Sequence, residues 1–328
     1  MKKSNPSADY AVTVVVPTRN AESTIVLNLE AITRQQYPIR EIILVDNVSS
    51  DNTVTVAKKF AKKHPGLKIR FLVNTRDIMV AGSFNRGIRA ARTPYVVTMH
   101  GDCCFATENE LKTLMMPILK DKSIIATYGI VENPLAIWKQ YNFWEKCLLA
   151  VHAGVPTPGL VGKIDCYQKK TLLTIGGYDA LKYKEIGGED ADLHLRLREQ
   201  GKIVETTAKV LHLHYLDKHF KLIDWIIKKK NTARTYGRLL RIHGLRMGIK
   251  GVIAFLFKPF LAMIVLIPGI SILAIPMLVV FQFWYYRKMF MAIDTLLDPR
   301  IILVPFIGIF LMYYETFWII EAFLRRIK

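Results

Sequence analysis

The fold is decided by residues 12–20, VTVVVPTRN, where five β-branched positions lead into a polar loop. An unbroken β-branched run of this kind predicts a strand buried on both faces, which is typical of parallel sheets. Similar runs occupy residues 41–45, 68–73 and 95–99, with helical patterns between them. This alternation predicts an α/β fold with a mostly parallel sheet and helices on both faces.

Polar side chains stand where each of these strands is expected to end. Thr18 and Asn20 follow the first strand, Asp46 ends the second, Arg76 follows the third and Asp102 follows the fourth. Such sheets bind ligands just beyond the carboxyl ends of their strands, and a nucleotide would lie across that edge. The loop after the first strand lacks Gly-x-Gly-x-x-Gly, and no Walker loop is present, which argues against a dehydrogenase and a P-loop nucleotidase.

A second polar stretch, GGEDADLHLRLR at residues 187–198, reads as the start of an amphipathic helix. Leu193 and Leu197 fall on one stripe. Glu189 and Asp190 would lie in the first turn, where exposed amides and the helix dipole favour acids. From this stretch alone, a well-capped helix and a catalytic site are both open interpretations.

Charge and hydrophobicity divide the 328 residues, which carry a net charge of +19, into three regions. Residues 218–250 hold ten basic side chains against one acidic, and residues 251–328 are otherwise almost wholly apolar. We therefore expect a domain over residues 1–217, basic amphipathic membrane-interface helices over 218–250, and a transmembrane region of two to three segments over 251–328.

This pattern predicts a multi-pass protein of the cell membrane. The short polar N-terminus has no signal-peptide core, so the first domain should be cytoplasmic. The basic excess indicates anionic lipid head groups as partners rather than nucleic acid. The densest basic run lies next to apolar segments, and it contains no recognisable nucleic-acid-binding motif.

Several motifs in order resemble those of family 2 glycosyltransferases. They are VVPTRN at residues 15–20, VDNVSSDNT at residues 45–53, Asp102, and Glu189-Asp190. The likeness spans about residues 11–216. It implies an inverting enzyme with the Rossmann-like GT-A fold that uses nucleotide-diphosphate sugars.

The resemblance also implies roles for the residues of the donor site. The loop with Pro17, Thr18 and Asn20 corresponds to the one beside the nucleobase and ribose, and Asp46 to the acid that contacts the base and ribose region. Arg76, which follows the third strand, is expected to bind the nucleotide sugar with them.

The metal and the catalytic base are implied in the same way. Asp102 matches the last acid of the Asp-x-Asp motif, which holds Mg²⁺ or Mn²⁺ against the diphosphate, and Asp190 matches the base, with Glu189 beside it. The first acid of the metal motif is replaced by His100, which either binds the metal or only lines the donor pocket. His214 is a further candidate metal ligand.

The basic region predicts contact with lipid. Most of its cations should anchor the chain to anionic lipids, while Arg234 and Arg238 are the candidates to bind a lipid acceptor phosphate or the donor diphosphate. The expected function is sugar transfer from a nucleotide-diphosphate sugar to a lipid-linked acceptor, either a polyprenyl phosphate or a lipid-linked glycan. The alternative is a non-catalytic membrane protein that binds nucleotide sugars through a degenerate GT-A domain, for which the His100 replacement is the main support.

Overall fold

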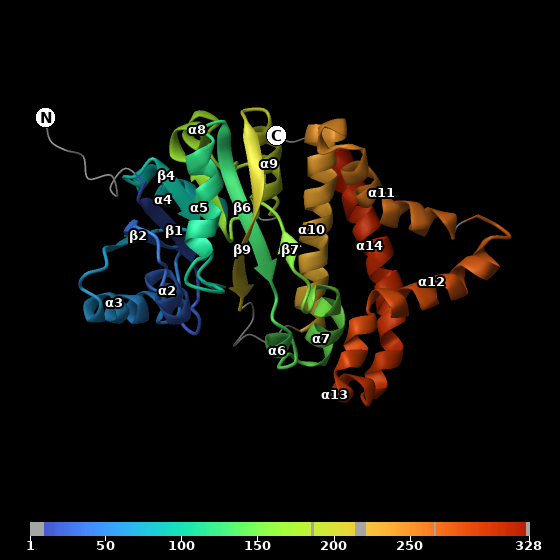
Figure 1. The fold of residues 1–328 in the computed structure, drawn as a ribbon. Helices are drawn as coiled ribbons and strands as arrows, with labels where there is room; N and C mark the ends of the chain where they lie inside the picture. Colours follow the sequence, from blue (N-terminus) through green and yellow to red (C-terminus); the bar gives the residue numbers. More distant parts are fainter. Residues whose placement is uncertain (1–9, 185–186, 214–220, 266, 326–328) are drawn as a thin grey trace, which may run out of the picture. The chain divides into compact units, whose positions relative to one another are not determined.

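A computed structural model describes residues 10–184, 187–213, 221–265 and 267–325. The chain divides into two compact units, and both are discontinuous in sequence. Unit 1 comprises Met1–Pro134, Pro156–Lys184 and Glu189–Asp217, whereas unit 2 comprises Leu135–Val155, Glu185–Gly188 and Lys218–Lys328. Most elements of both units are labelled in Figure 1.

Unit 1 is built on one sheet with the strand order β3-β2-β1-β4-β8-β6-β9-β5, and β7 pairs with β6. The strands are β1 (Val12–Thr18), β2 (Ile39–Asp46), β3 (Ile69–Val73), β4 (Tyr95–Thr98), β5 (Cys103–Phe105), β6 (Ile124–Glu132), β7 (Thr157–Pro158), β8 (Asp165–Gln168) and β9 (Lys202–His212). The buried runs of the sequence therefore form strands close to their predicted places.

The prediction of a mostly parallel sheet needs correction, because the sheet is mixed. Strands β3, β2, β1 and β4 are parallel to one another as expected. Strand β8, however, lies antiparallel to both β4 and β6, and β5 lies antiparallel to β9. β5 and β8 have only three and four residues, too few to show a strand period in the sequence.

Helices pack on both faces of this sheet, as predicted. They are α2 (Ile25–Thr33), α3 (Thr53–Lys63), α4 (Met79–Ala90), α5 (Glu110–Lys120), α8 (Lys169–Thr174) and α9 (Glu189–Arg198). Val14 and Val16 of β1 belong to one buried cluster with Leu29 of α2. Val15 belongs to a second cluster with Phe84 of α4. Successive side chains of a strand point to opposite faces, and because both faces are covered, every position of β1 is buried.

Unit 2 is helical. It contains α6 (Leu135–Trp138), α7 (Phe143–Leu149), α10 (Leu222–His243), α11 (Ile249–Ile264), α12 (Ser271–Tyr285), α13 (Ile293–Leu296) and α14 (Val304–Leu324), with 3₁₀ turns at Ala150–His152, Gly244–Met247, Arg287–Met291 and Pro299–Leu303. Its main cluster joins Trp138 and Leu148 of the early segment to Trp225, Met289 and Leu311.

One helix among the described residues, Pro299–Leu324, is long and apolar enough to cross a membrane. The other expected spans do not meet that length. The apolar stretch from Val252 to Tyr286 is divided by the turn at Pro268-Gly269 into α11 and α12, with 16 and 15 residues. The prediction of a multi-pass protein with two to three spanning segments is therefore not supported.

The basic region, expected to form interface helices, is mostly helical. It forms one 22-residue helix, α10, which buries one side against α14. At Gly237 the two backbones approach so closely that a Cβ would lie 2.2 Å from the carbonyl oxygen of Ile319. Glu315 and Glu321 of α14 pair with the α10 cations Lys229 (3.1 Å) and Arg234 (3.3 Å).

Candidate active site

Thr18 and Asp46 lie side by side at the carboxyl ends of β1 and β2. They are register partners in the sheet, and each is at most 5% exposed. Asp46 Oδ2 accepts a hydrogen bond from the Ser49 amide at 3.2 Å. Among the described residues, the Thr18 hydroxyl and Asp46 Oδ1 have no hydrogen-bond partner. Buried polar atoms without partners are costly, so this edge is suited to a ligand that offers hydrogen bonds.

The other predicted donor residues have different surroundings. Asn20 has a left-handed backbone (φ 49°) and joins two loops, because its Oδ1 accepts from the Ser50 amide at 2.8 Å and its own amide donates to Ser49 Oγ at 2.9 Å. Pro17 is buried within β1. Arg76 is exposed beyond β3. Asn20 therefore shapes the donor loop, and Arg76 is at the surface of unit 1.

The loop that carries Asp102 is fixed by α2. Asn28, a fully buried amide on that helix, donates hydrogen bonds to the carbonyl oxygens of His100 (3.0 Å) and Cys103 (2.7 Å). The Thr24 hydroxyl donates to the carbonyl of Gly101 at 3.1 Å. Sequence analysis missed Asn28, although a polar residue on the apolar stripe of a helix is a detectable signal.

Asp102, Cys103 and His212 gather ligand atoms that lie within 4.8 Å of one another. The antiparallel pairing of β5 with β9 sets Cys103 opposite His212. His212 Nε2 is 3.4 Å from Asp102 Oδ2. Burial raises the pKa of the Cys103 thiol well above its usual range, so Cys103 keeps its proton, and its sulfur lies 3.8 Å from Asp102 Oδ1.

The tautomer of His212 supports a cation at this position. Its Nδ1 lies 3.1 Å from Asn133 Oδ1, and an amide oxygen only accepts, so Nδ1 carries the hydrogen. In the neutral tautomer Nε2 turns a lone pair toward Asp102 and can bind a cation shared with that carboxylate, whereas the imidazolium would pair with Asp102 directly. The donor set of one carboxylate and one imidazole suits a divalent ion such as Mn²⁺.

His100, the predicted alternative ligand, is outside this group of described residues. Its ring packs 5.6 Å from that of Phe84, and burial lowers its pKa to about 4, so the imidazole is neutral. The other candidate, His214, lies outside the described residues. His212, which precedes it by two residues, instead lies against Asp102.

Asn133→Leu should weaken Mn²⁺ binding by about 10–100-fold, because the partner that orients a metal-binding histidine contributes that much to affinity. The substituted side chain cannot accept from Nδ1, so the tautomer that presents Nε2 is no longer favoured. Electron paramagnetic resonance of free Mn²⁺ measures the change. Asn133→Asp, which still accepts, should retain affinity, and equal affinity in Asn133→Leu and the native protein would refute the role.

The predicted catalytic acids begin helix α9, as the sequence indicated. Asp190 Oδ1 accepts a hydrogen bond from the Ala191 amide at 2.8 Å. Burial raises the pKa of Asp190, and burial followed by the charge of Asp190 raises the pKa of Glu189 to about 7. The Lys163 cation opposes both shifts. Two acids whose pKa values are moved by their surroundings are suited to proton transfer near neutral pH.

Helix α9 is held in place by a side-chain network that sequence analysis did not identify. Asp192 is 2% exposed and accepts from Arg196 at 2.7 Å and from the Tyr183 hydroxyl at 3.2 Å. Arg196 also donates to the carbonyls of Ile175 and Gly177 at 2.9 and 2.8 Å. Asp192 is therefore an anchor of the helix as well as part of its first turn.

Gly187 and Gly188 precede α9 in a backbone conformation that favours glycine. Both have positive φ, at 77° and 97°. Within unit 2, the Gly187 carbonyl accepts from the Thr235 hydroxyl at 2.8 Å. A Cβ on Gly188 would lie 2.1 Å from the Thr235 methyl group. Close packing on α10 and backbone geometry thus require glycine here.

Asp165 is a further acid that sequence analysis did not identify. It is fully buried at the start of β8, where it accepts from the Gly162 amide and, at 3.2 Å, from the Tyr167 hydroxyl. Tyr167 in turn bonds Tyr178 at 3.1 Å. Burial raises the pKa of Asp165 to about 8, with the charge of Asp190 acting in the same direction.

Asp165→Asn should remove a pH-dependent loss of stability. The folded carboxyl keeps its proton to about pH 8, whereas the unfolded one loses it near its ordinary pKa of 3.8. The stability that the neutral acid contributes is therefore fully present below pH 3.8 and is lost as the pH rises from there to about 8. The free energy of unfolding falls by up to ~1.4 kcal/mol per pH unit in this range. Thermal unfolding between pH 5 and 8 tests this, with exposed Asp121→Asn as control. An unchanged slope in Asp165→Asn would contradict the assignment.

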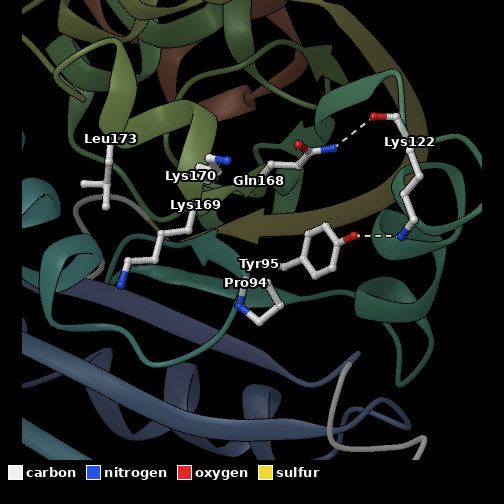
Figure 2. Close-up of a pocket in the computed structure, with 7 residues that line it drawn as sticks. All are labelled: Pro94, Tyr95, Lys122, Gln168, Lys169, Lys170 and Leu173. Carbon is white, nitrogen blue, oxygen red and sulfur yellow. Dashed lines mark hydrogen bonds between the residues drawn. The ribbon is translucent and has the colours of Figure 1, made fainter.

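A cavity of about 550 Å³ lies at the other end of β4 (Figure 2). It is lined by Pro94 and Tyr95, which begin that strand, and by Lys122, Gln168, Lys169, Lys170 and Leu173. Its lysines are partly engaged, since Lys122 donates to the Tyr95 hydroxyl at 3.1 Å and Lys169 to the carbonyl of Ala91. Asp102 follows the opposite end of β4, so this cavity is separate from the donor edge.

The predicted acceptor arginines lie on α10 in unit 2. The Arg234 side chain is 19% exposed and pairs with Glu321. Arg238 is half-buried. The ion pair with Glu321 gives Arg234 a structural role within unit 2.

Comparison with known proteins indicates the family and the fold of the chain. Residues 13–170 match the model of "Glycosyl transferase family 2". The chain is 26% identical over 202 residues to a putative glycosyltransferase, EpsE, of Bacillus subtilis, an alignment that covers 58% of this chain and 67% of that protein.

A second relative is the dolichyl N-acetyl-alpha-D-glucosaminyl phosphate 3-beta-D-2,3-diacetamido-2,3-dideoxy-beta-D-glucuronosyltransferase of Methanococcus voltae, at 25% identity over 222 residues. That alignment covers 62% of this chain and 66% of the relative, just under two thirds of its length. Among solved structures, the mannosyltransferase PcManGT of Pyrobaculum calidifontis, in complex with GDP-Man and Mn²⁺, has a TM-score of 0.55 at 16% identity and covers 95% of this chain and 84% of its own.

Proposed function

Because this chain belongs to glycosyl transferase family 2, we propose that it transfers a sugar, with inversion, from a nucleotide-diphosphate sugar to a lipid-linked acceptor. The observation that carries the proposal is the meeting of Thr18 with Asp46, and of Asp102 with His212, at the ends of strands in unit 1. The proposal adds a donor, an acceptor and residue roles to family membership.

The donor half of the site supports a nucleotide-diphosphate. Thr18 and Asp46 offer a hydroxyl and a carboxylate oxygen to the base and ribose, and Asn20 holds their loop. Asp102 and His212 would hold a divalent cation, which would supply neutralisation of charge on the diphosphate. The fold neighbour PcManGT contains GDP-Man with Mn²⁺, which supports the same ligand class for this chain.

Asp190 is the proposed general base. Inversion requires an acceptor oxygen to attack opposite the leaving nucleotide, and the Asp190 carboxylate takes the proton that this oxygen loses. Burial makes it a stronger base than an exposed aspartate. Glu189, whose pKa is raised to about 7 by burial and by the charge of Asp190, is proposed to orient the acceptor.

The acceptor is proposed to be lipid-linked. The name of the Methanococcus voltae relative specifies a dolichyl-phosphate-linked sugar as its acceptor, and unit 2 of this chain has an apolar helix long enough to enter a membrane. Two acceptor chemistries follow. A polyprenyl phosphate is already anionic and needs little base, whereas the hydroxyl of a lipid-linked glycan depends on Asp190.

The test is transfer by the purified full-length chain in detergent, with a panel of radiolabelled nucleotide sugars and both kinds of lipid acceptor. Label in the lipid phase that disappears with EDTA would support the proposal. Saturable binding of a nucleotide sugar without transfer to any acceptor would instead favour the non-catalytic alternative, a binding protein with a degenerate site.

A further inference from the structure

The helices α11 and α12 of unit 2 leave large apolar side chains uncovered. Phe260 of α11 is 62% exposed, and Ile272, Leu273 and Met277 of α12 are 70–77% exposed. Only the inner side of the pair is buried, where Ala262 and Leu278 meet Met312 of α14. Contiguous apolar surface of this kind marks a binding surface on a soluble protein or contact with a membrane.

The charge pattern of this pair favours lipid over a protein partner. No Asp, Glu, Lys or Arg occurs from Pro259 to Tyr286, a run of 28 residues. Its middle is the turn at Pro268-Gly269, where Gly269 has φ +83°. Figure 1 shows α11 and α12 as the two arms of a hairpin whose turn points away from α14. The uncharged run therefore covers the far end of the hairpin and all of α12, whereas Lys258 lies within α11 and Arg287 lies just after α12.

The arms are too short to cross a bilayer. Helices of 16 and 15 residues are about 24 and 22 Å long, whereas the hydrocarbon core is about 30 Å thick. Because neither arm is long enough to cross, a chain that enters hydrocarbon along α11 returns along α12 to the side from which it entered.

Helix α14 cannot cross while α10 is packed on it. Lys229 and Arg234 of α10 pair with Glu315 and Glu321 of α14, and residues 228–241 carry six basic side chains. Between Arg300 and Glu315 the chain has 14 uncharged residues, the last 11 of them in α14, with a length of about 21 Å as an α-helix. A full crossing would draw the α10 cations into hydrocarbon, where charges are strongly disfavoured.

From these lengths and pairs we infer that unit 2 binds the membrane from one side only. The α11–α12 hairpin inserts into anionic bilayers, the basic α10 stays at the same surface, and no helix among residues 221–325 spans the membrane. The occupant of the apolar surface is lipid, because the uncharged far end of the hairpin and the cations at its base match the order of hydrocarbon and phosphate in a leaflet. This inference does not depend on sugar transfer.

Vesicle flotation of the full-length protein tests the insertion. Ile272→Glu with Met277→Glu places two charges on exposed positions of the hairpin and should lower binding to phosphatidylcholine–phosphatidylglycerol vesicles by more than about tenfold. The matched control is Leu181→Glu in unit 1, where the native side chain is 87% exposed, and it should float like the native protein. Unchanged flotation of the double variant would overturn the inference, as would a stable dimer in solution that does not bind vesicles.

Protease protection tests the topology. Epitope tags at the two chain ends, in sealed membrane vesicles, should both be removed by protease added to the same side. Removal of one tag with protection of the other would mean that a helix crosses, and would overturn one-sided binding. Neither readout uses transfer activity, so a failure here is distinguishable from a failure of the proposed glycosyltransferase reaction.

Discussion

Asp190→Asn should lower the rate of transfer to a lipid-linked hydroxyl acceptor by about 10²–10⁴-fold, the usual contribution of a positioned general base. The amide keeps the size of the side chain and can still accept from the Ala191 amide, so α9 should begin as before. Because the base acts on the acceptor proton, affinity for the donor nucleotide should change little. Single-turnover transfer with radiolabelled donor measures the rate, and calorimetry measures donor binding.

Two comparisons make this experiment decisive. Asp121→Asn, on the exposed surface of unit 1, should transfer at the native rate. A polyprenyl phosphate acceptor needs little base, so near-native transfer by Asp190→Asn to that acceptor would exclude the glycan-hydroxyl version and leave the phosphate version. Loss of donor affinity parallel to the loss of rate would contradict the assignment of Asp190 as the base.

Asp102→Ala should abolish measurable Mn²⁺ binding and lower transfer by about 10³-fold, because a metal at a leaving diphosphate contributes several kcal/mol and each 1.4 kcal/mol is tenfold in rate. The variant removes the carboxylate that faces His212 Nε2 at 3.4 Å. Mn²⁺ titration followed by electron paramagnetic resonance reads the site directly, before any turnover.

The matched control for Asp102 is Glu205→Gln, which removes one carboxylate from the same strand that carries His212 but on its exposed part. It should leave Mn²⁺ affinity unchanged. EDTA should reduce the native rate to that of Asp102→Ala and have little further effect on the variant. Native Mn²⁺ affinity in Asp102→Ala would contradict the proposed site.

The parallel half of the sheet could be predicted from the sequence because each strand there is one long apolar run. Strands β1, β2 and β4 are buried on both faces, and their ends could be read from Asp46 and Asp102. Strand β8 could not be placed in this way. It enters between β4 and β6 through pairings with residues 37 to 73 positions away, which leave no local pattern.

The same reasoning explains which site residues were found. Asp102 and Asp190 stand within motifs, so their positions could be predicted. Asn133 and His212 are 79 residues apart, and only the β6–β9 pairing brings their strands together. Asp165 lies in a short segment with no surrounding acids. The basic composition of α10 was evident from the sequence. The acids that pair with its cations, Glu315 and Glu321, are more than 80 residues further along the chain, so the ion pairs could not be predicted.

The discontinuity of unit 2 has a consequence for synthesis and for dissection of the protein. Trp138 and Leu148 pack against Met289 and Leu311, so their apolar surface stays without its partners until the end of the chain has been made. Because a ribosome adds roughly 5–20 residues per second, that interval is about 10–30 s. A fragment ended at residue 217 would keep residues 135–155 and lose everything they pack on within unit 2. Unit 1 is therefore best isolated with residues 135–155 redesigned or deleted, since simple truncation leaves their apolar surface exposed and prone to aggregation.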